Sequence, residues 1–88
     1  MKMRKKIGKS TEYRIMQAQR RRMGGSLAVY RKVSDDEYLK YYQNDIRIIT
    51  LSGTRWLYLF ALDSIEDCVN IVSGFNGVIV NVDNLDVC

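Results

Sequence analysis

The pattern of apolar positions changes character near residue 25. Beyond that point, short stretches rich in β-branched and aromatic residues alternate with stretches whose apolar side chains recur at helical spacing. Four strands are predicted on this basis: Leu27–Val33, Ile46–Leu51, Arg55–Leu62 and Val78–Val82. The two intervening helices begin after Ser34 and Ser64, each of which has an acid three residues further on, as in a capping box.

The order of these elements predicts an α+β fold of the ferredoxin-like, split βαββαβ type, with a four-stranded antiparallel sheet and two helices on one face. Right-handed crossovers place the strands at 27–33 and 55–62 in the centre of the sheet. The segment Ser52-Gly53-Thr54 is predicted to form a short hairpin turn, in which Gly53 supplies the positive φ.

The residues before the first predicted strand form a separate basic arm. Residues 1–9 have little to bury and are expected to be disordered in isolation. A helix is predicted between a cap at Ser10 and a stop at Gly24-Gly25, with Tyr13 and Met16 among its few apolar residues. We therefore divide the chain into an arm, 1–25, partly disordered or helical, and a small α+β domain, 26–88.

The strand at 55–62 is apolar on both sides and offers two sets of side chains at period two. The aliphatic set, Leu57, Leu59 and Ala61, suits packing under helices. The aromatic set is then expected on the open face of the sheet, together with a tyrosine of the first strand: Tyr30, Trp56, Tyr58 and Phe60. Three interpretations of this set stay open: a core, a homodimer or protein-partner interface, and a platform for stacking nucleic-acid bases.

In element order and in aromatics on the central strands, this arrangement resembles the RNA-recognition motif. The stretch 53–60 lacks the glycines and the aromatic spacing of that motif's third strand. The resemblance is therefore confined to the order of elements, and no membership of that family follows from it.

Charged residues are distributed unevenly along the chain. Residues 1–32 hold eleven Lys or Arg against one acid, a charge of +10, whereas residues 33–88 hold three against nine acids, a charge of −6. Segregated cations attract polyanions or an acidic protein surface, and most of the acids are accounted for by helix caps. We take the following cations as candidate contacts to a nucleic acid or partner: Lys5, Lys6, Lys9, Arg14, Arg20, Arg21, Arg22, Arg31, Lys32 and Arg55.

The residue inventory argues against an enzyme. Histidine is absent, and two cysteines, Cys68 and Cys88, do not make a zinc site without it. Cys68 falls on the inward stripe of a predicted helix and is interpreted as a core residue. No catalytic residues, metal or cofactor are therefore expected. No apolar run reaches the roughly 18 residues of a membrane span, and a reduced, cytoplasmic protein without membrane contact is expected.

These observations predict a non-enzymatic binding module that contacts the phosphate backbone of DNA or RNA through the basic arm. The alternative is a small inhibitor or adaptor that binds a nucleic-acid-binding protein, of the phage type that blocks a host enzyme such as a CRISPR effector. A homodimer through the open sheet face, and salt-sensitive association of the basic arm with the acidic domain, are further outcomes that the sequence leaves open.

Overall fold

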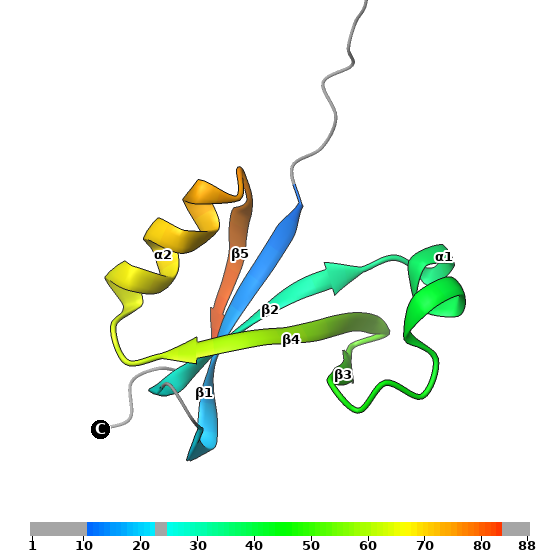
Figure 1. The fold of residues 1–88 in the computed structure, drawn as a ribbon, viewed down its shortest axis with the longest axis horizontal. Helices are drawn as coiled ribbons and strands as arrows, with labels where there is room; N and C mark the ends of the chain where they lie inside the picture. Colours follow the sequence, from blue (N-terminus) through cyan, green and yellow to red (C-terminus); the bar gives the residue numbers. More distant parts are fainter. Residues whose placement is uncertain (1–10, 23–24, 84–88) are drawn as a thin grey trace, which may run out of the picture.

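A computed structural model describes the backbone of residues 11–22 and 25–83, with side chains for 11–17 and 26–83. Its elements in chain order are β1 (Glu12–Arg22), β2 (Gly25–Val33), α1 (Asp35–Glu37), the π-helical turn η1 (Tyr38–Tyr42), β3 (Ile48–Leu51), β4 (Thr54–Leu62), α2 (Ile65–Gly74) and β5 (Val78–Asp83), as drawn in Figure 1. The predicted strands and helices after residue 25 are all present, within a few residues of their expected bounds.

The strands form one five-stranded mixed sheet in the order β3-β4-β2-β1-β5. Neighbouring strands are antiparallel except for β1 and β5, which run parallel. The molecule is thus a small α+β domain, as expected, but the prediction of four antiparallel strands was wrong. Strands β3, β4, β2 and β5 keep the order expected of a ferredoxin-like sheet, and β1 is inserted between β2 and β5.

Strand β1 replaces the helix that was predicted over residues 10–23. Its residues pair on both sides, since Tyr13 lies opposite Arg31 of β2 and Ile79 of β5. Tyr13 and Ile15 point to the same face at period two, and they are only 5% and 0% exposed. The few apolar residues of this segment fit the period of a helix as well as that of a strand. Pairing with β2 and β5 selects the strand. Residues 12–22 of the predicted arm therefore belong to the sheet, whereas the disorder predicted for residues 1–9 lies outside the described residues.

The predicted caps and the hairpin turn are confirmed. The Glu37 amide donates to Ser34 Oγ at 3.1 Å, and the Asp67 amide donates to Ser64 Oγ at 3.3 Å. The acid of the first cap does not return the bond, because the Glu37 carboxylate accepts from Arg31 instead. Between β3 and β4, Ser52 and Gly53 have φ of 50° and 81°, which is the geometry of a two-residue hairpin turn with positive φ at both positions.

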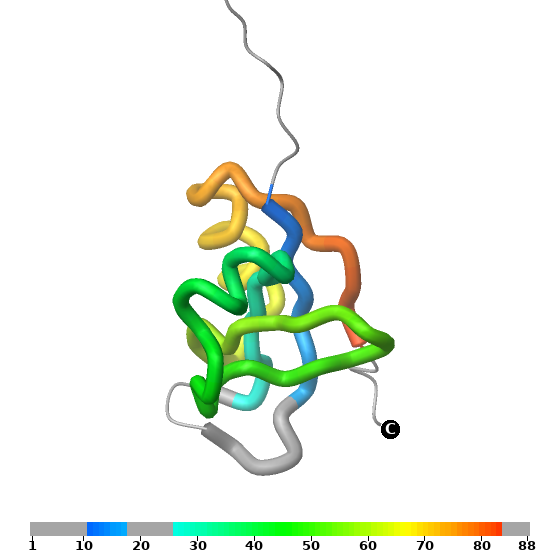
Figure 2. Tube along the Cα trace, turned by 90° about the vertical axis from the view of Figure 1, so that its right-hand side faces the viewer, coloured from blue at the N-terminus to red at the C-terminus, as the bar shows by residue number. Residues whose placement is uncertain are grey.

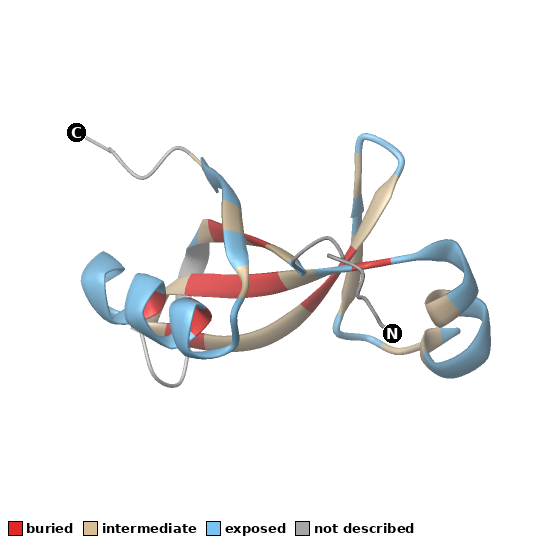
Figure 3. Cartoon of the chain, turned by 90° about the horizontal axis from the view of Figure 1, so that it is seen from above, coloured by how far each residue is buried: buried red, intermediate tan, exposed pale blue. Residues whose placement is uncertain are grey.

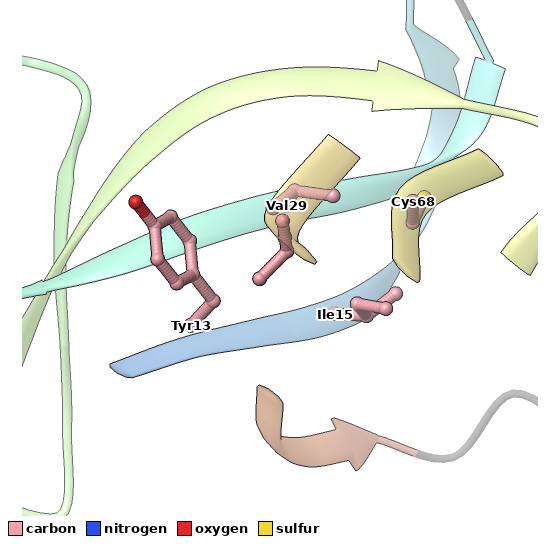
Figure 4. Packing of buried hydrophobic residues seen from close by; sticks show 5 residues of the cluster. Tyr13, Ile15, Val29 and Cys68 are labelled. Carbon is pink, nitrogen blue, oxygen red and sulfur yellow. The ribbon is translucent and has the colours of Figure 1, made fainter. Parts of the chain in front are cut away.

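The main core lies between α2 and the sheet, on the face that we call the helix face. Ile15, Val29 and Cys68 are fully buried there, next to Tyr13 and Val72 (Figure 4). The prediction that Cys68 is a core residue is confirmed. These positions come from β1, β2 and α2, so the core requires the inserted strand.

A bulge in β4 divides the predicted aromatic row between the two faces. Val29 lies opposite Phe60 and the next residue, Tyr30, lies opposite Tyr58, so Leu59 is an extra residue. Phe60 and Leu59 therefore pack on the helix face, whereas Trp56 and Tyr58 pack on the opposite side, which we call the Trp56 face. Ala61, which lies opposite Ala28, is also on the Trp56 face. The strict alternation predicted for this strand was therefore wrong.

The sheet is strongly twisted. In Figure 1, β4 crosses β1 and β5 at a steep angle, and Figure 2 shows the β3–β4 hairpin from the side. Burial is concentrated in the sheet and on the inner side of α2, whereas α1 and η1 have no buried residue (Figure 3). Within the described residues, no helix is long and apolar enough to cross a membrane.

Candidate nucleic-acid interface

The Trp56 face has a small apolar cluster of its own. Ala28, Tyr30 and Trp56 are buried, and Tyr58 packs beside them with its ring centroid 5.6 Å from that of Tyr30. Trp56 and Tyr30 are only 4% and 6% exposed, although α2 lies on the other face. Neither ring presents an open surface to a nucleic-acid base in this conformation. Of the three interpretations, a role in the core therefore fits these two residues. Tyr58 is half-buried, and Phe60 belongs to the helix face.

Arg14 forms part of the cover over this cluster. Its guanidinium lies 4.9 Å from the Trp56 ring centroid. The same group makes a bidentate pair with Asp83, with Nε 3.0 Å from Oδ2 and Nη2 3.1 Å from Oδ1. The two side chains are only 15% and 25% exposed, so this ion pair is partly buried. Within the described residues, the buried Trp56 Nε1 has no hydrogen-bond partner.

Arg31 is held on the opposite face. Two residues beyond Val29 on β2, it points to the helix face, where it donates to Glu37 and to the Tyr42 hydroxyl. Burial lowers the pKa of Arg31, but the hydrogen bond and the charge of Glu37 outweigh that effect and leave it raised above its ordinary value. Arg31 therefore ties α1 and η1 to the sheet on the side that also carries α2.

Arg55 and Lys32 also have carboxylate partners. Arg55 Nη1 lies 2.8 Å from Asp35 Oδ1, and the guanidinium stacks 4.0 Å from the centroid of Tyr38. Lys32 Nζ lies 3.6 Å from Glu12 Oε1, a longer contact between more exposed side chains.

The structure thus separates the predicted contact residues instead of gathering them. Arg14 and Lys32 lie on the Trp56 face, whereas Arg31 and Arg55 reach toward α1 and η1. Three others, Arg20, Arg21 and Arg22, lie at the end of β1, where the structure describes the backbone alone, and the remaining three, Lys5, Lys6 and Lys9, fall outside the described residues. Sequence reasoning missed the paired acids. Asp83 is 69 residues from Arg14, and nothing local in the sequence links them.

These pairs change the electrostatic picture. Residues 11–88 contain nine Lys or Arg and ten acids, whereas residues 1–10 contain five Lys or Arg and no acid. Among the described side chains, Arg14, Arg31, Lys32, Arg47 and Arg55 each have a carboxylate within 4.0 Å. The charge imbalance that the sequence places in residues 1–32 is therefore concentrated in residues 1–10 and at Arg20–Arg22.

Two observations on the described residues concern metal ligands and the Cys68 thiol. No three His, Cys, Asp or Glu side chains within residues 11–17 and 26–83 lie close enough together to hold a metal ion. Burial, and then the charge of Asp67, raise the pKa of the Cys68 thiol, which favours the unreactive protonated form.

Comparison with known proteins adds no functional assignment: no family model, curated protein or solved structure matches the chain.

Proposed function

We propose that this protein is a non-enzymatic nucleic-acid-binding module that contacts phosphates through the cations of residues 1–10 and Arg20–Arg22. The observation that carries the proposal is the excess of five cations over acids in residues 1–10, next to a domain of nearly balanced charge. Lys5, Lys6 and Lys9 are the principal contacts, and Arg20–Arg22 are the second group. Arg31 and Arg55 are assigned a structural role because each already binds an acid.

The position of Arg20–Arg22 supports their inclusion. Within the described residues, strand β5 pairs with β1 over Glu12–Met16, and β1 continues to Arg22 beyond these pairs. Pairing with β2 is also irregular there, since five steps of β1 from Gln17 to Arg22 match two steps of β2. Arginine binds phosphate oxygens in a fork, and three arginines in succession at the end of a strand suit the backbone of a nucleic acid.

A salt titration tests this proposal. Labelled duplex DNA, single-stranded DNA and RNA are titrated with the full chain at two salt concentrations. Each phosphate contact contributes about 0.7–0.9 to the slope of log K against log salt, so the double variant Lys5→Gln/Lys6→Gln should reduce that slope by about 1–2.

The matched control is the double variant Lys40→Gln/Arg47→Gln, which removes the same charge from two exposed positions between β2 and β3. It should leave the slope nearly unchanged. Absence of binding at low salt would overturn the proposal. An equal reduction of the slope in both double variants would indicate general attraction by net charge and not contact by residues 1–10.

A second candidate function is that of an inhibitor or adaptor that binds a protein. Residues 56–88 contain five acids and no Lys or Arg, and α2 leaves Ile65, Val69 and Ile71 well exposed. Such a surface suits a basic protein with an apolar patch. Capture from a lysate, with and without nuclease, separates the two functions, because a partner retained after nuclease favours the protein-binding role.

A further inference from the structure

Strand β5 is an edge of the sheet with exposed apolar side chains. Among the described strands it pairs with β1 alone. Val78, Val80 and Val82 are 46%, 43% and 47% exposed, although valine is an apolar residue that strands usually bury. The outer backbone N–H and C=O groups of such a strand are a template for another strand.

The opposite edge strand, β3, is shorter and its apolar side chains are better covered. It has four residues, and its Ile49 and Leu51 pack against the Trp56 cluster. Strand β5 has six residues and no lysine or proline, which are the usual guards of an exposed edge. Its one protective feature is a bulge at Val80, the extra residue between the partners of Tyr13 and Arg14, which shortens the regular edge.

The charge of the edge indicates what pairs with it. From Val78 to Val82 the strand is uncharged, and its terminal Asp83 is neutralised by the bidentate contact with Arg14. Two copies of this strand therefore meet without like-charge repulsion, and valines of one copy meet valines of the other. An antiparallel pair about a two-fold axis is the self-complementary arrangement of this kind.

We propose that β5 pairs antiparallel with β5 of a second copy, which joins two five-stranded sheets into one. The pairing satisfies backbone groups at the edge and removes exposed valine surface from water. A domain of this size has a small core, and dimerisation is a common way to extend it. This interface lies at an edge of the sheet and differs from the open-face dimer that the sequence left open as one possibility, and it does not depend on nucleic-acid binding.

Sedimentation of the full chain over a range of concentrations, at low and high salt, tests the proposal. A dimer that persists at high salt is expected. Val80→Lys should raise the dimer dissociation constant about ten-fold or more, because an edge lysine opposes strand addition. Ile46→Lys is the matched control, since Ile46 is 96% exposed in the loop before β3, and it should leave the constant unchanged.

A cross-linking measurement covers the case in which Val80→Lys does not fold. In a Cys88→Ser background, Val80→Cys places thiols near the two-fold axis and should form a disulfide dimer under mild oxidation, whereas Ile46→Cys should not. A monomer at the highest soluble concentration would overturn the proposal. So would a dimer that dissociates at high salt, which would indicate charge attraction between residues 1–10 and the acidic domain.

Discussion

The two faces of the sheet bury aromatic and aliphatic side chains by different means. On the helix face, α2 covers Ile15 and Val29 with Cys68 and Val72, and the buried cluster contains no charge. On the Trp56 face, the cover includes the ion pair of Arg14 with Asp83, and Trp56 is only 4% exposed. Arg14, which the sequence suggested as a phosphate contact, thus helps to cover a buried cluster.

The difference has an energetic consequence. Apolar burial on the helix face contributes roughly 25 cal/mol per Å² and is not screened by salt as an ion pair is. The pair on the Trp56 face is partly hydrated, so it stabilises less and weakens as salt rises. We therefore expect the helix face to dominate stability and the Trp56 face to respond to ionic conditions.

The largest expected effect is on the helix face. Ile15→Ala removes a side chain with no exposed surface between β1 and α2 and should lower the free energy of unfolding by about 2–5 kcal/mol. Chemical denaturation followed by circular dichroism measures it. A cost below about 1 kcal/mol would contradict the position of β1 inside the core, because truncation of a buried isoleucine to alanine typically costs about 2–5 kcal/mol.

Two glycines give the next comparison. A Cβ added at Gly77 would overlap the buried Tyr13 ring, whereas at Gly74 it would meet nothing within 4 Å. Gly77→Ala should therefore destabilise the protein by about 1–3 kcal/mol through overpacking on the helix face. Gly74→Ala, at the end of α2, should be neutral or stabilising by up to about 1 kcal/mol. Thermal unfolding of the pair tests this, and equal shifts would contradict it.

On the Trp56 face, a double-mutant cycle with Arg14→Gln and Asp83→Asn measures the ion pair. Because both groups are partly exposed, the coupling should be about 1–2 kcal/mol and should fall as salt is added. Arg14→Gln should also make Trp56 fluorescence more sensitive to iodide, since the guanidinium lies over the ring. If quenching is the same as in the unsubstituted protein, Arg14 does not form the cover.

The smallest effect concerns Asp45 and Arg47, a bidentate pair at the surface that serves as the exposed counterpart of the Arg14 pair. Hydrogen bonds from the Arg47 side chain, and then from its backbone, lower the pKa of Asp45 to about 2. A lowered folded-state pKa means that this contribution to stability is complete above the ordinary value of 3.8 and is lost as the pH falls toward 2. NMR titration of the Asp45 carboxyl should show the lowered pKa, and Arg47→Gln should return it toward 3.8.

Much of the fold followed from local signals. The strands after residue 25, the serine caps and the Ser52-Gly53 turn depend on side chains within a few residues, so the sequence alone predicted them. The candidate site was less predictable. The cations were found by counting, but the acids that bind Arg14 and Arg55 come from positions 69 and 20 residues away.

The sequence by itself determined where charged and apolar residues are concentrated: the cations in residues 1–10, the acids in residues 56–88 and the apolar residues in the strands after residue 25. Tertiary structure alone decided that Glu12–Arg22 is a strand, that the bulge at Leu59 turns Phe60 to the helix face, and which cations are neutralised. Periodicity in a thin apolar pattern is ambiguous, and only pairing with β2 and β5 selects the period. Ion pairs between distant residues form only when the sheet brings their strands together, so the number of charges available to a partner is a property of the fold.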